Sequence, residues 1–364
     1  MSLIKGLGAF FALDIGTRSI RVAQVSGEIR TGFRLERFGY LPIDPKMTQD
    51  TSEAGNRALG EAIKDVVNGA GIITKNIVIG LPAAKTFTTI VEVPNQPLSE
   101  LKKVMKYKLD SYIPTPIGEA EVDWIPLGPL PNDPTKANVL ISSTTSAFAE
   151  TRMEMVEDLG FYVIGEEPDP IAICRSLAPY DATDARLIVD YGENSSDIVV
   201  YYAGGPRLVR AVPIGLKNLT KTASLSLSVK EEQARQFLLK FGLSQDKLDG
   251  RMFTAVNTTL DSFINELRKT VSFFQDNYPN VPIGGILLSG FAEVIPFMGE
   301  YIEAKLSTPT KRGNPWQRVI VPPEFQVNLA PVATEFAVCL GLAERVNDVQ
   351  PVIKNPFEFI GGKK

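Results

Sequence analysis

The sequence predicts an α/β protein built from two similar lobes, with a smaller α+β subdomain inserted into the first lobe. Two segments carry this prediction. Near the N-terminus, an apolar strand ends in Asp14-Ile15-Gly16, and a second apolar strand follows the turn Thr17-Arg18-Ser19. In mid-chain, an apolar strand ends in Asp190-Tyr191-Gly192, and another follows the polar residues 193–196. The same β-hairpin in both halves of the chain indicates duplicated folding units.

Each of the two turns has the chemistry of a phosphate site. Backbone N–H groups in a tight turn can hold a phosphate chain, and a neighbouring Asp can hold a hydrated Mg²⁺. Two such turns that face each other can clamp a nucleotide from both sides. A duplicated Asp-x-Gly hairpin resembles those of the actin-like ATPase superfamily, which includes DnaK-type chaperones and sugar kinases. The resemblance implies two actin-like (RNase H-like) lobes around a nucleotide cleft.

The composition of the chain excludes several kinds of function and site. The 364 residues suffice for two domains with sizeable cores, and the net charge of −4 gives no electrostatic support for nucleic-acid binding. Because the chain has no histidine, Ser-His-Asp triads and histidine metal sites are excluded. Cys174 and Cys339 lack a CxxC spacing, so we expect buried thiols in a reducing compartment. No apolar run approaches the ~18–20 residues of a membrane span, which favours a cytoplasmic protein.

The first half reads as a lobe interrupted by the smaller subdomain. For the lobe we expect strands at 10–13, 20–25, 34–40 and 76–81 and a helix at 54–70. For the subdomain we expect strands at 87–94, 120–127 and 137–144 and helices at 99–112 and 147–159. The first of these helices should begin with Ser99 as its N-cap and end before Pro114. A strand at 161–164 and a helix at 171–177 lead back to the lobe.

The second half begins with the second hairpin, at 186–202, and a third strand at 207–213. The pattern then predicts helices at 221–227, 231–241, 254–278 and 296–306, a buried strand at 286–289, an edge strand at 318–321 and a last helix at 332–345. We therefore divide the chain into a first lobe (1–82 and 161–185), the inserted subdomain (83–160), a second lobe (186–329), a C-terminal helix that packs back on the first lobe (330–346) and a flexible tail (347–364).

Four segments together resemble the PilM family, the cytoplasmic actin-like proteins of type IV pilus assembly. The resemblance covers nearly the whole chain, from about Phe10 to Arg345. Its segments are the first hairpin, the stretch from Val91-Glu92-Val93-Pro94 to Tyr112-Ile113-Pro114, the second hairpin with Arg210-Ala211-Val212-Pro213-Ile214-Gly215, and the Ala/Gly-rich residues 330–343. The middle two are the most specific, because actin and the sugar kinases lack them.

The resemblance implies a protein that binds ATP and Mg²⁺ as structural ligands and is at most a slow ATPase. It implies docking of the N-terminal cytoplasmic tail of a PilN-like inner-membrane protein, which would hold the chain at the inner membrane. Other assembly proteins of the pilus or a related type II secretion system, and self-association, are further expected contacts. Two other functions stay open. An FtsA-like division protein usually ends in an amphipathic membrane helix, but residues 352–360 are short and broken by Pro356. A sugar kinase needs a catalytic Asp in the cleft, and we find none after a glycine-rich substrate loop.

The candidate ligands of phosphate and metal lie in the two turns. Asp14 and Asp190 are expected to reach Mg²⁺ through water, or else only to cap their turns. Backbone or hydroxyl contacts to phosphates are expected from Gly16, Thr17, Arg18, Gly192, Asn194 and Ser195. For Arg18 the alternative is a solvated turn residue. Asn194 stands where many relatives have glycine, a mild change because Asn tolerates a left-handed turn.

The adenosine side departs from the family, whose loop reads Leu-Ser-Gly-Gly-Gly. Here it reads Leu288-Ser289-Gly290-Phe291-Ala292, although glycines are what let the backbone lie against base and ribose. Gly290 and Phe291 are the candidates for adenosine contacts, and Phe291 either stacks on adenine or obstructs the pocket. On the long helix, Glu266 or Lys269 is expected to touch ribose, unless both belong to a solvated face.

Glu167 is the candidate for a general base or a water-orienting residue. It lies in Glu166-Glu167-Pro168, before the helix that links the halves. In DnaK-type chaperones and the bacterial actin MreB, a similar Glu-Pro stretch places a carboxylate near the attacking water. With no histidine in the chain, Glu167 is the best candidate for this role. The alternative is an acid that only stabilises a helix N-terminus.

Overall fold

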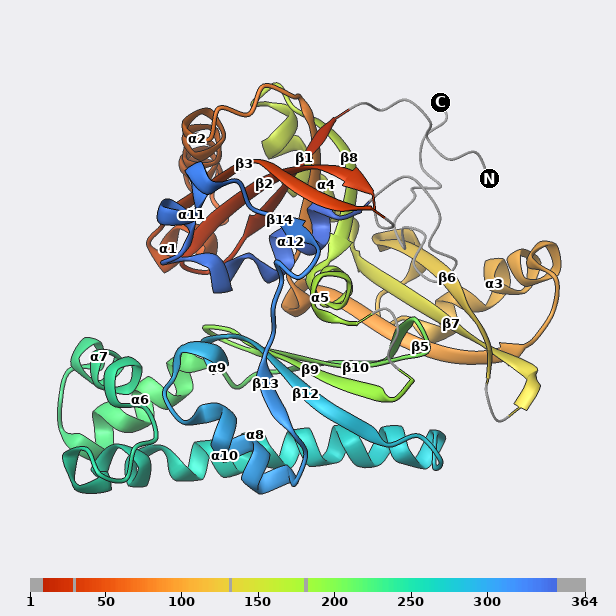
Figure 1. The fold of residues 1–364 in the computed structure, drawn as a ribbon. Coiled ribbons are helices and arrows are strands. Elements are labelled where there is room, and N and C mark those ends of the chain that lie inside the picture. Colours follow the sequence, from red (N-terminus) through yellow and green to blue (C-terminus); the bar gives the residue numbers. More distant parts are fainter. Residues whose placement is uncertain (1–8, 29–30, 131–132, 180–182, 346–364) are drawn as a thin grey trace. The chain divides into compact units, whose positions relative to one another are not determined.

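The structure, a computed structural model, describes residues 9–28, 31–130, 133–179 and 183–345 (Figure 1). Contacts between residues divide the chain into two compact units. The first unit consists of residues 1–176 and 315–364, and the second unit of residues 177–314. The second unit is therefore inserted into the chain of the first. The tail predicted at 347–364 lies outside the described residues.

The first unit contains a six-stranded mixed sheet covered by helices. In spatial order its strands are β14 (Val319–Ile320), β3 (Gly32–Pro42), β2 (Ser19–Glu28), β1 (Phe10–Ile15), β4 (Asn76–Leu81) and β8 (Tyr162–Pro168). The helices of its first segment outside the inserted subdomain are α1 (Pro45–Gln49), α2 (Glu53–Gly69), α4 (Ser146–Glu157) and α5 (Asp169–Leu177). Ile63 of α2 packs with Leu13 and Ile79 of the sheet in one buried cluster. The predicted hairpin, the helix at 54–70 and the strand at 76–81 are confirmed.

The C-terminal segment returns to this sheet (Figure 1). The predicted edge strand is present as β14, only two residues long, and it pairs in parallel with β3. It is followed by α11 (Pro323–Leu329), a 3-10 helix (Ala333–Phe336) and α12 (Ala337–Ala343), which packs against β1, β2 and β4. The single α-helix predicted over 332–345 is wrong in its first turn. The amide of Glu335 donates to the carbonyl of Val332 at 2.9 Å in an i→i+3 bond, and the indole N–H of Trp316 donates to the Ala333 carbonyl at 2.9 Å.

The inserted segment forms a three-stranded antiparallel sheet with one long helix. Its strands lie in the order β5 (Thr86–Pro94), β7 (Asp133–Thr145) and β6 (Ala120–Leu130), and its helices are α3 (Leu98–Tyr112) and the 3-10 turns Ala83–Lys85 and Ile117–Glu119. Leu101 and Met105 of α3 pack on one face of the sheet, and Ile171 of α5 packs on the other. The N-cap predicted at Ser99 is wrong. The helix begins at Leu98, because the carbonyl of Pro97 already accepts hydrogen bonds from Glu100 and Leu101.

The second unit has a five-stranded mixed sheet and its own core. Its strands lie in the order β11 (Gly205–Val212), β10 (Ser196–Tyr202), β9 (Ala185–Tyr191), β12 (Ile283–Gly290) and β13 (Thr310–Arg312). Its helices are α6 (Leu216–Leu227), α7 (Glu231–Phe241), the 3-10 turn Leu248–Gly250, α8 (Arg251–Asn277), α9 (Phe291–Val294) and α10 (Met298–Leu306). The long predicted helix is confirmed as α8. Its buried residues recur every three or four positions, as in Leu260, Phe263 and Leu267.

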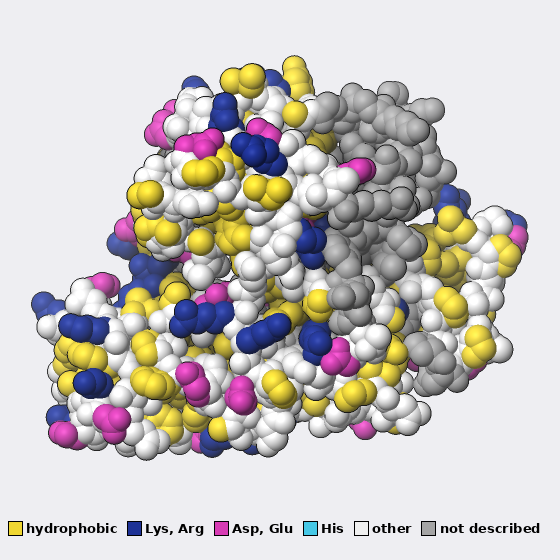
Figure 2. Space-filling view, in the orientation of Figure 1, with side chains coloured by type: hydrophobic (Ala, Val, Ile, Leu, Met, Phe, Trp, Pro, Cys, Tyr) yellow, Lys and Arg dark blue, Asp and Glu magenta, His cyan; other side chains and the backbone are white. Residues whose placement is uncertain are grey.

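The surface carries both signs of charge. On the face shown in Figure 2, basic and acidic side chains are interspersed with apolar ones. Among the described residues no single helix has the length and apolar character to cross a membrane, and only the bent pair of Pro323–Leu329 with Ala333–Ala343 reaches that criterion when its two parts are taken together.

Candidate functional site

The first candidate turn joins β1 to β2. The strands pair in antiparallel register, with Asp14 opposite Arg21. The amide of Gly16 donates to the carbonyl of Ser19 at 3.0 Å and closes the turn, which contains Thr17 and Arg18. A Cβ at position 16 would lie only 2.1 Å from an Nη atom of Arg21, so a side chain there would displace this guanidinium. The carbonyl of Arg18 accepts a hydrogen bond from the amide of Ile43, and the side chain of Arg18 is exposed.

A partly buried charge cluster lies beside this turn. Arg21 contacts both carboxylate oxygens of Asp14, with Nε–Oδ2 at 3.0 Å and Nη2–Oδ1 at 3.1 Å. Glu335, in the 3-10 turn before α12, accepts from the hydroxyls of Ser19 and Tyr40, both at 2.9 Å, and lies 3.6 Å from Arg21. Burial raises the pKa of Asp14 against the opposing attraction of Arg21. The first turn therefore has a buried guanidinium that two carboxylates share.

The second candidate turn joins β9 to β10 and repeats this geometry. Here the amide of Gly192 donates to the carbonyl of Ser195 at 2.9 Å. A Cβ at Gly192 would lie 2.7 Å from that same carbonyl oxygen, so glycine is required here. The N-terminus of α6 supports the turn, because the amides of Leu216 and Lys217 donate to the carbonyls of Gly192 and Glu193. Asn194 is exposed at the tip.

Three carboxyl groups meet at the second turn. Asp190 stands opposite Asp197 in the register of β9 and β10. Burial raises the pKa of Asp197 to about 8, and the charge of Asp190 adds to the effect. Burial also raises the pKa of Glu293 on α9 to about 8, with Asp190 reinforcing and Arg312 opposing the shift. The Oε1 atom of Glu293 is buried without a hydrogen-bond partner. At neutral pH, protons on Asp197 and Glu293 thus relieve the repulsion with Asp190.

The loop predicted to face adenosine lies against the second turn. Gly290 has a φ of +64°, and a Cβ there would meet the Tyr191 carbonyl oxygen at 2.6 Å and Asp190 Oδ1 at 2.8 Å. The ring of Phe291 is covered by the guanidinium of Arg235, 5.2 Å from its centre. Arg235 also contacts both carboxylate oxygens of Glu193 at 2.9 Å. The structure thus connects Phe291 to the second turn through an arginine on α7.

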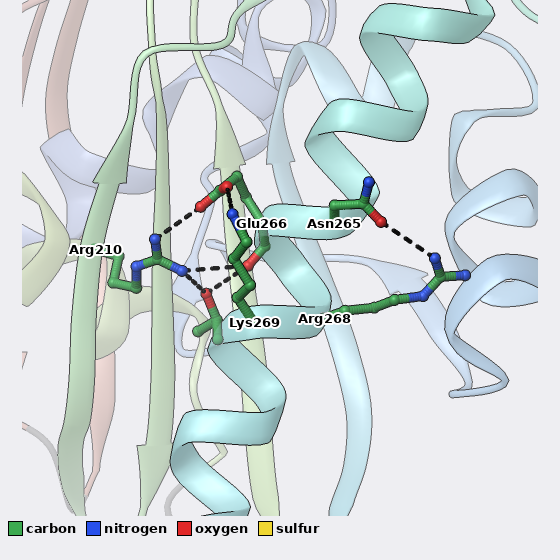
Figure 3. Close-up of polar contacts among 6 residues, drawn as sticks. Arg210, Asn265, Glu266, Arg268 and Lys269 are labelled. Carbon is green, nitrogen blue, oxygen red and sulfur yellow. Dashed lines mark hydrogen bonds and ion pairs between the residues drawn. The ribbon is translucent and has the colours of Figure 1, made fainter.

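Glu266 and Lys269 belong to a separate polar cluster on α8 (Figure 3). Arg210 of β11 donates to Glu266 at 2.7 Å, and Lys269 donates to the same carboxylate at 2.6 Å. Arg268 faces another side of α8 and donates to Asn265. Among the described residues, the hydrogen bonds and ion pairs of Glu266 and Lys269 tie α8 to β11 and do not reach the second turn. The ribose contact stays a prediction.

Glu167 is enclosed in ion pairs of the first unit. Its side chain is fully buried, with Arg175 at 2.7 Å and Arg345 at 3.8 Å. Arg175 also donates to the carbonyl of Gly341 at 2.6 Å. Asp169 lies near Gly80 of β4, since a Cβ added to Gly80 would lie 2.6 Å from its Oδ1, and its charge acts on Arg21 beside the first turn. The catalytic role of Glu167 stays a prediction, and its contacts describe a structural tie between β8, α5 and α12.

Sequence reasoning missed four side chains that lie at the turns: Arg21, Asp169, Glu335 and Arg235. Of these four, only the position of Arg21 could have been predicted from the sequence. In an antiparallel hairpin with a closed turn, the residue opposite Asp14 follows from counting outward from the turn. The others come from distant segments of the chain, and no local pattern predicts where they pack.

The fold places the chain in a class of known proteins. Its structure is similar to that of the ethanolamine utilization protein EutJ from Carboxydothermus hydrogenoformans, with a TM-score of 0.53, 14% identity and coverage of 92% of this chain and 88% of that one. It is also similar to MreB 5 of Spiroplasma citri bound to AMPPNP, with a TM-score of 0.54, 10% identity and coverage of 92% and 94%. These likenesses define an actin-like fold, as predicted.

The family is narrower than this class. The model of the family described as type IV pilus assembly protein PilM matches residues 12–347, and the chain belongs to this family. A solved structure of a PilM-PilN type IV pilus biogenesis complex is similar over 92% of this chain and 97% of that one, with a TM-score of 0.76 and 23% identity. The predicted family is confirmed. The alternatives of an FtsA-like division protein and a sugar kinase are not favoured.

Proposed function

We propose that this protein works in type IV pilus assembly by docking the N-terminal cytoplasmic tail of a PilN-like inner-membrane protein. The observation that carries this proposal is the family match over residues 12–347, supported by the similar PilM-PilN complex. In this proposal the chain is cytoplasmic and is held at the inner membrane by its partner. Other pilus assembly proteins, and further copies of the chain, are additional partners in the same proposal.

The inserted subdomain offers the surface for such a tail. Strand β5 pairs only with β7 among the described residues, so one edge of this nine-residue strand has no partner strand. An extended peptide can add to an open edge through main-chain hydrogen bonds, while apolar side chains give specificity. Leu98 and Tyr107 on α3 are exposed, Tyr107 by 83%, and are candidate apolar contacts.

Lysines on α3 add a preference for an acidic tail. Lys102, Lys103 and Lys106 are all exposed. Lys103 is paired with Glu100 at 2.9 Å, whereas Lys102 and Lys106 have no ion pair among the described residues. Charge at the rim of an interface mainly raises the association rate and its sensitivity to salt. We therefore expect salt to weaken binding of the tail.

A peptide titration with backbone hydrogen exchange tests the docking site. A synthetic tail peptide is added to the full chain, and the amides of β5 are expected to exchange more slowly in the complex. Lys106→Glu should weaken binding about threefold to tenfold through the association rate. The matched control is Lys64→Glu, an exposed lysine on α2, which should change nothing. If the peptide binds while β5 exchanges as before, the tail docks elsewhere.

We propose in addition that the chain binds ATP with Mg²⁺ at the two turns and turns it over slowly. Support comes from the two closed Asp-x-Gly turns, because tight turns of this kind can hold phosphate oxygens through backbone N–H groups. Asp14 and Asp190 carry hard carboxylate oxygens of the kind that Mg²⁺ prefers. In this proposal Gly16, Thr17, Arg18, Gly192, Asn194 and Ser195 contact phosphates, and Asp14 and Asp190 hold the metal through water.

Calorimetric titration with ATP, with Mg²⁺ or with a chelator, tests this second proposal. Binding should require the metal, since it screens the phosphates from the carboxylates of both turns. Turnover should lie far below ~10 per second, the median for enzymes. Equal affinity for ATP in the presence of the chelator would show that binding does not need the metal. No heat of binding in either condition would show that the chain does not bind ATP.

A further inference from the structure

Arg235 of α7 is a largely enclosed side chain that forms an ion pair with Glu193 of the second turn. The side chains of Arg235 and Glu193 are only 11% and 7% exposed, and one guanidinium nitrogen, Nη1, contacts both carboxylate oxygens at 2.9 Å. The ring of Phe291 lies on its face, 5.2 Å from ring centre to guanidinium carbon. Arginine is thus fixed by two independent contacts, one electrostatic and one by stacking.

The position of Glu193 conflicts with a phosphate on this turn. Glu193 lies between Gly192 and Ser195, the residues whose backbone hydrogen bond closes the turn. An anion bound by the turn amides would meet a carboxylate of like charge as its neighbour. Phosphate and carboxylate oxygens also accept charge-assisted hydrogen bonds from the same guanidinium. An arriving phosphate and Glu193 are therefore rivals for Arg235.

We propose that Arg235 is an anion-binding residue of the second turn and that Glu193 is its internal competitor. Glu193 neutralises the guanidinium in the free protein, and a phosphate of the ligand takes its place. Stacking on Phe291 keeps the guanidinium beside the turn during this exchange. The inference rests on the proposed nucleotide binding and extends it, because it names a residue that contacts the phosphate and a carboxylate that limits the affinity.

The variant Glu193→Gln separates this role from a purely structural one. Glutamine still accepts a hydrogen bond from Arg235, so a tie between α7 and the turn is largely kept. It carries no charge, so the competition with phosphate is lifted. A structural pair predicts unchanged or weaker binding in this variant, whereas a competitor predicts tighter binding.

The experiment is a calorimetric titration of the full chain with MgATP and, separately, with pyrophosphate. Glu193→Gln should bind both about tenfold more tightly, and Arg235→Ala about tenfold more weakly, the scale of one charge-assisted contact. Arg235→Lys should fall between Arg235→Ala and the unmodified chain, since lysine keeps the charge but loses the stacking of a planar guanidinium on Phe291. The matched control is Asp184→Asn. It neutralises the ion pair of Asp184 with Arg186, 2.9 Å apart at the other end of β9, and should leave both affinities unchanged.

The outcomes distinguish this inference from the proposed function. If the unmodified chain binds MgATP and neither Glu193→Gln nor Arg235→Ala changes the affinity, the inference is overturned and nucleotide binding stands. If only Glu193→Gln binds, the inference stands and the proposed nucleotide binding of the unmodified chain fails. If neither protein binds MgATP or pyrophosphate, both are overturned. Thermal unfolding without ligand shows whether each variant is folded.

Discussion

Gly341 on α12 is expected to tolerate no side chain, and Gly341→Ala should destabilise the first unit. A Cβ at this position would lie 1.9 Å from the carbonyl oxygen of Ala172 on α5 and 2.4 Å from its carbonyl carbon. The obstacle is backbone, which cannot rotate away as the end of a side chain can. Because non-bonded heavy atoms prefer ~3.5 Å, the two helices would have to separate by about 1.5 Å.

The size of the effect follows from what this separation disturbs. Overpacking of a core costs about 1–3 kcal/mol. The shift also stretches the hydrogen bond from Arg175 to the Gly341 carbonyl, now 2.6 Å, and an unsatisfied buried group costs about 1–3 kcal/mol. Since the two costs overlap, we expect the free energy of unfolding of the first unit to fall by about 3 kcal/mol. For a unit of this size that corresponds to roughly 6–12 °C in melting temperature.

Differential scanning calorimetry measures this change, because it separates the transitions of the two units where they differ. The control is Gly69→Ala, at the last residue of α2, where an added Cβ meets no atom within 4 Å. That variant should be neutral, or more stable by up to about 1 kcal/mol, because alanine favours helix. If Gly341→Ala stays within about 0.5 kcal/mol of the unmodified chain, the close crossing of α12 and α5 is refuted.

Three further predictions concern the charged groups. Asp14→Ala should weaken MgATP binding and reduce the rise in melting temperature that MgATP causes, both measured by calorimetry. An unchanged affinity would contradict the role of Asp14 as a metal-binding residue. The pKa values of Asp197 and Glu293 are raised to about 8 in the folded chain, so folding favours their protonated forms. The free energy of unfolding of the second unit should therefore fall as pH rises from about 5 to 8.5, because these protons are lost. Asp197→Asn should flatten that slope in thermal unfolding, and a slope that persists unchanged would count against it. Glu167→Gln should lower the stability of the first unit by about 3 kcal/mol in denaturant unfolding, because Arg175 loses a buried partner. A fully stable variant with lost turnover would support the water-orienting role instead.

The parts of the fold that sequence reasoning predicted are those stabilised by neighbours in the chain. Both hairpins follow from apolar strands on either side of an Asp-x-Gly turn, and α8 follows from its apolar period. The errors arise where a distant residue decides. Residues 333–336 form a 3-10 helix, and the carbonyl of its first residue accepts a hydrogen bond from the side chain of Trp316. Residues 315–329, predicted in the second lobe, lie in the first unit, where two residues of β14 pair with β3.

In the candidate site too, the sequence predicts the residues that local structure fixes and misses those that come from distant segments. The glycines at 16 and 192 and the carboxylates at 14 and 190 could be predicted because a tight turn constrains its own residues. Arg235 could not, since it acts through an ion pair with Glu193 and a ring contact with Phe291, both far away in sequence. Glu335 likewise reaches Ser19 from near the end of the chain.

The insertion of the second unit into the first has a consequence for biosynthesis. α12 covers β1, β2 and β4, strands that leave the ribosome long before it does. At ~5–20 residues per second, the stretch from α5 to α12 takes about 10–30 s to translate. During that interval the nascent first unit exposes the sheet face that Cys339 and its neighbours later bury, whereas residues 177–314 are continuous and can fold as soon as they emerge. The earliest strands should therefore be the ones that chaperones hold, and the unit made second should be the first to finish.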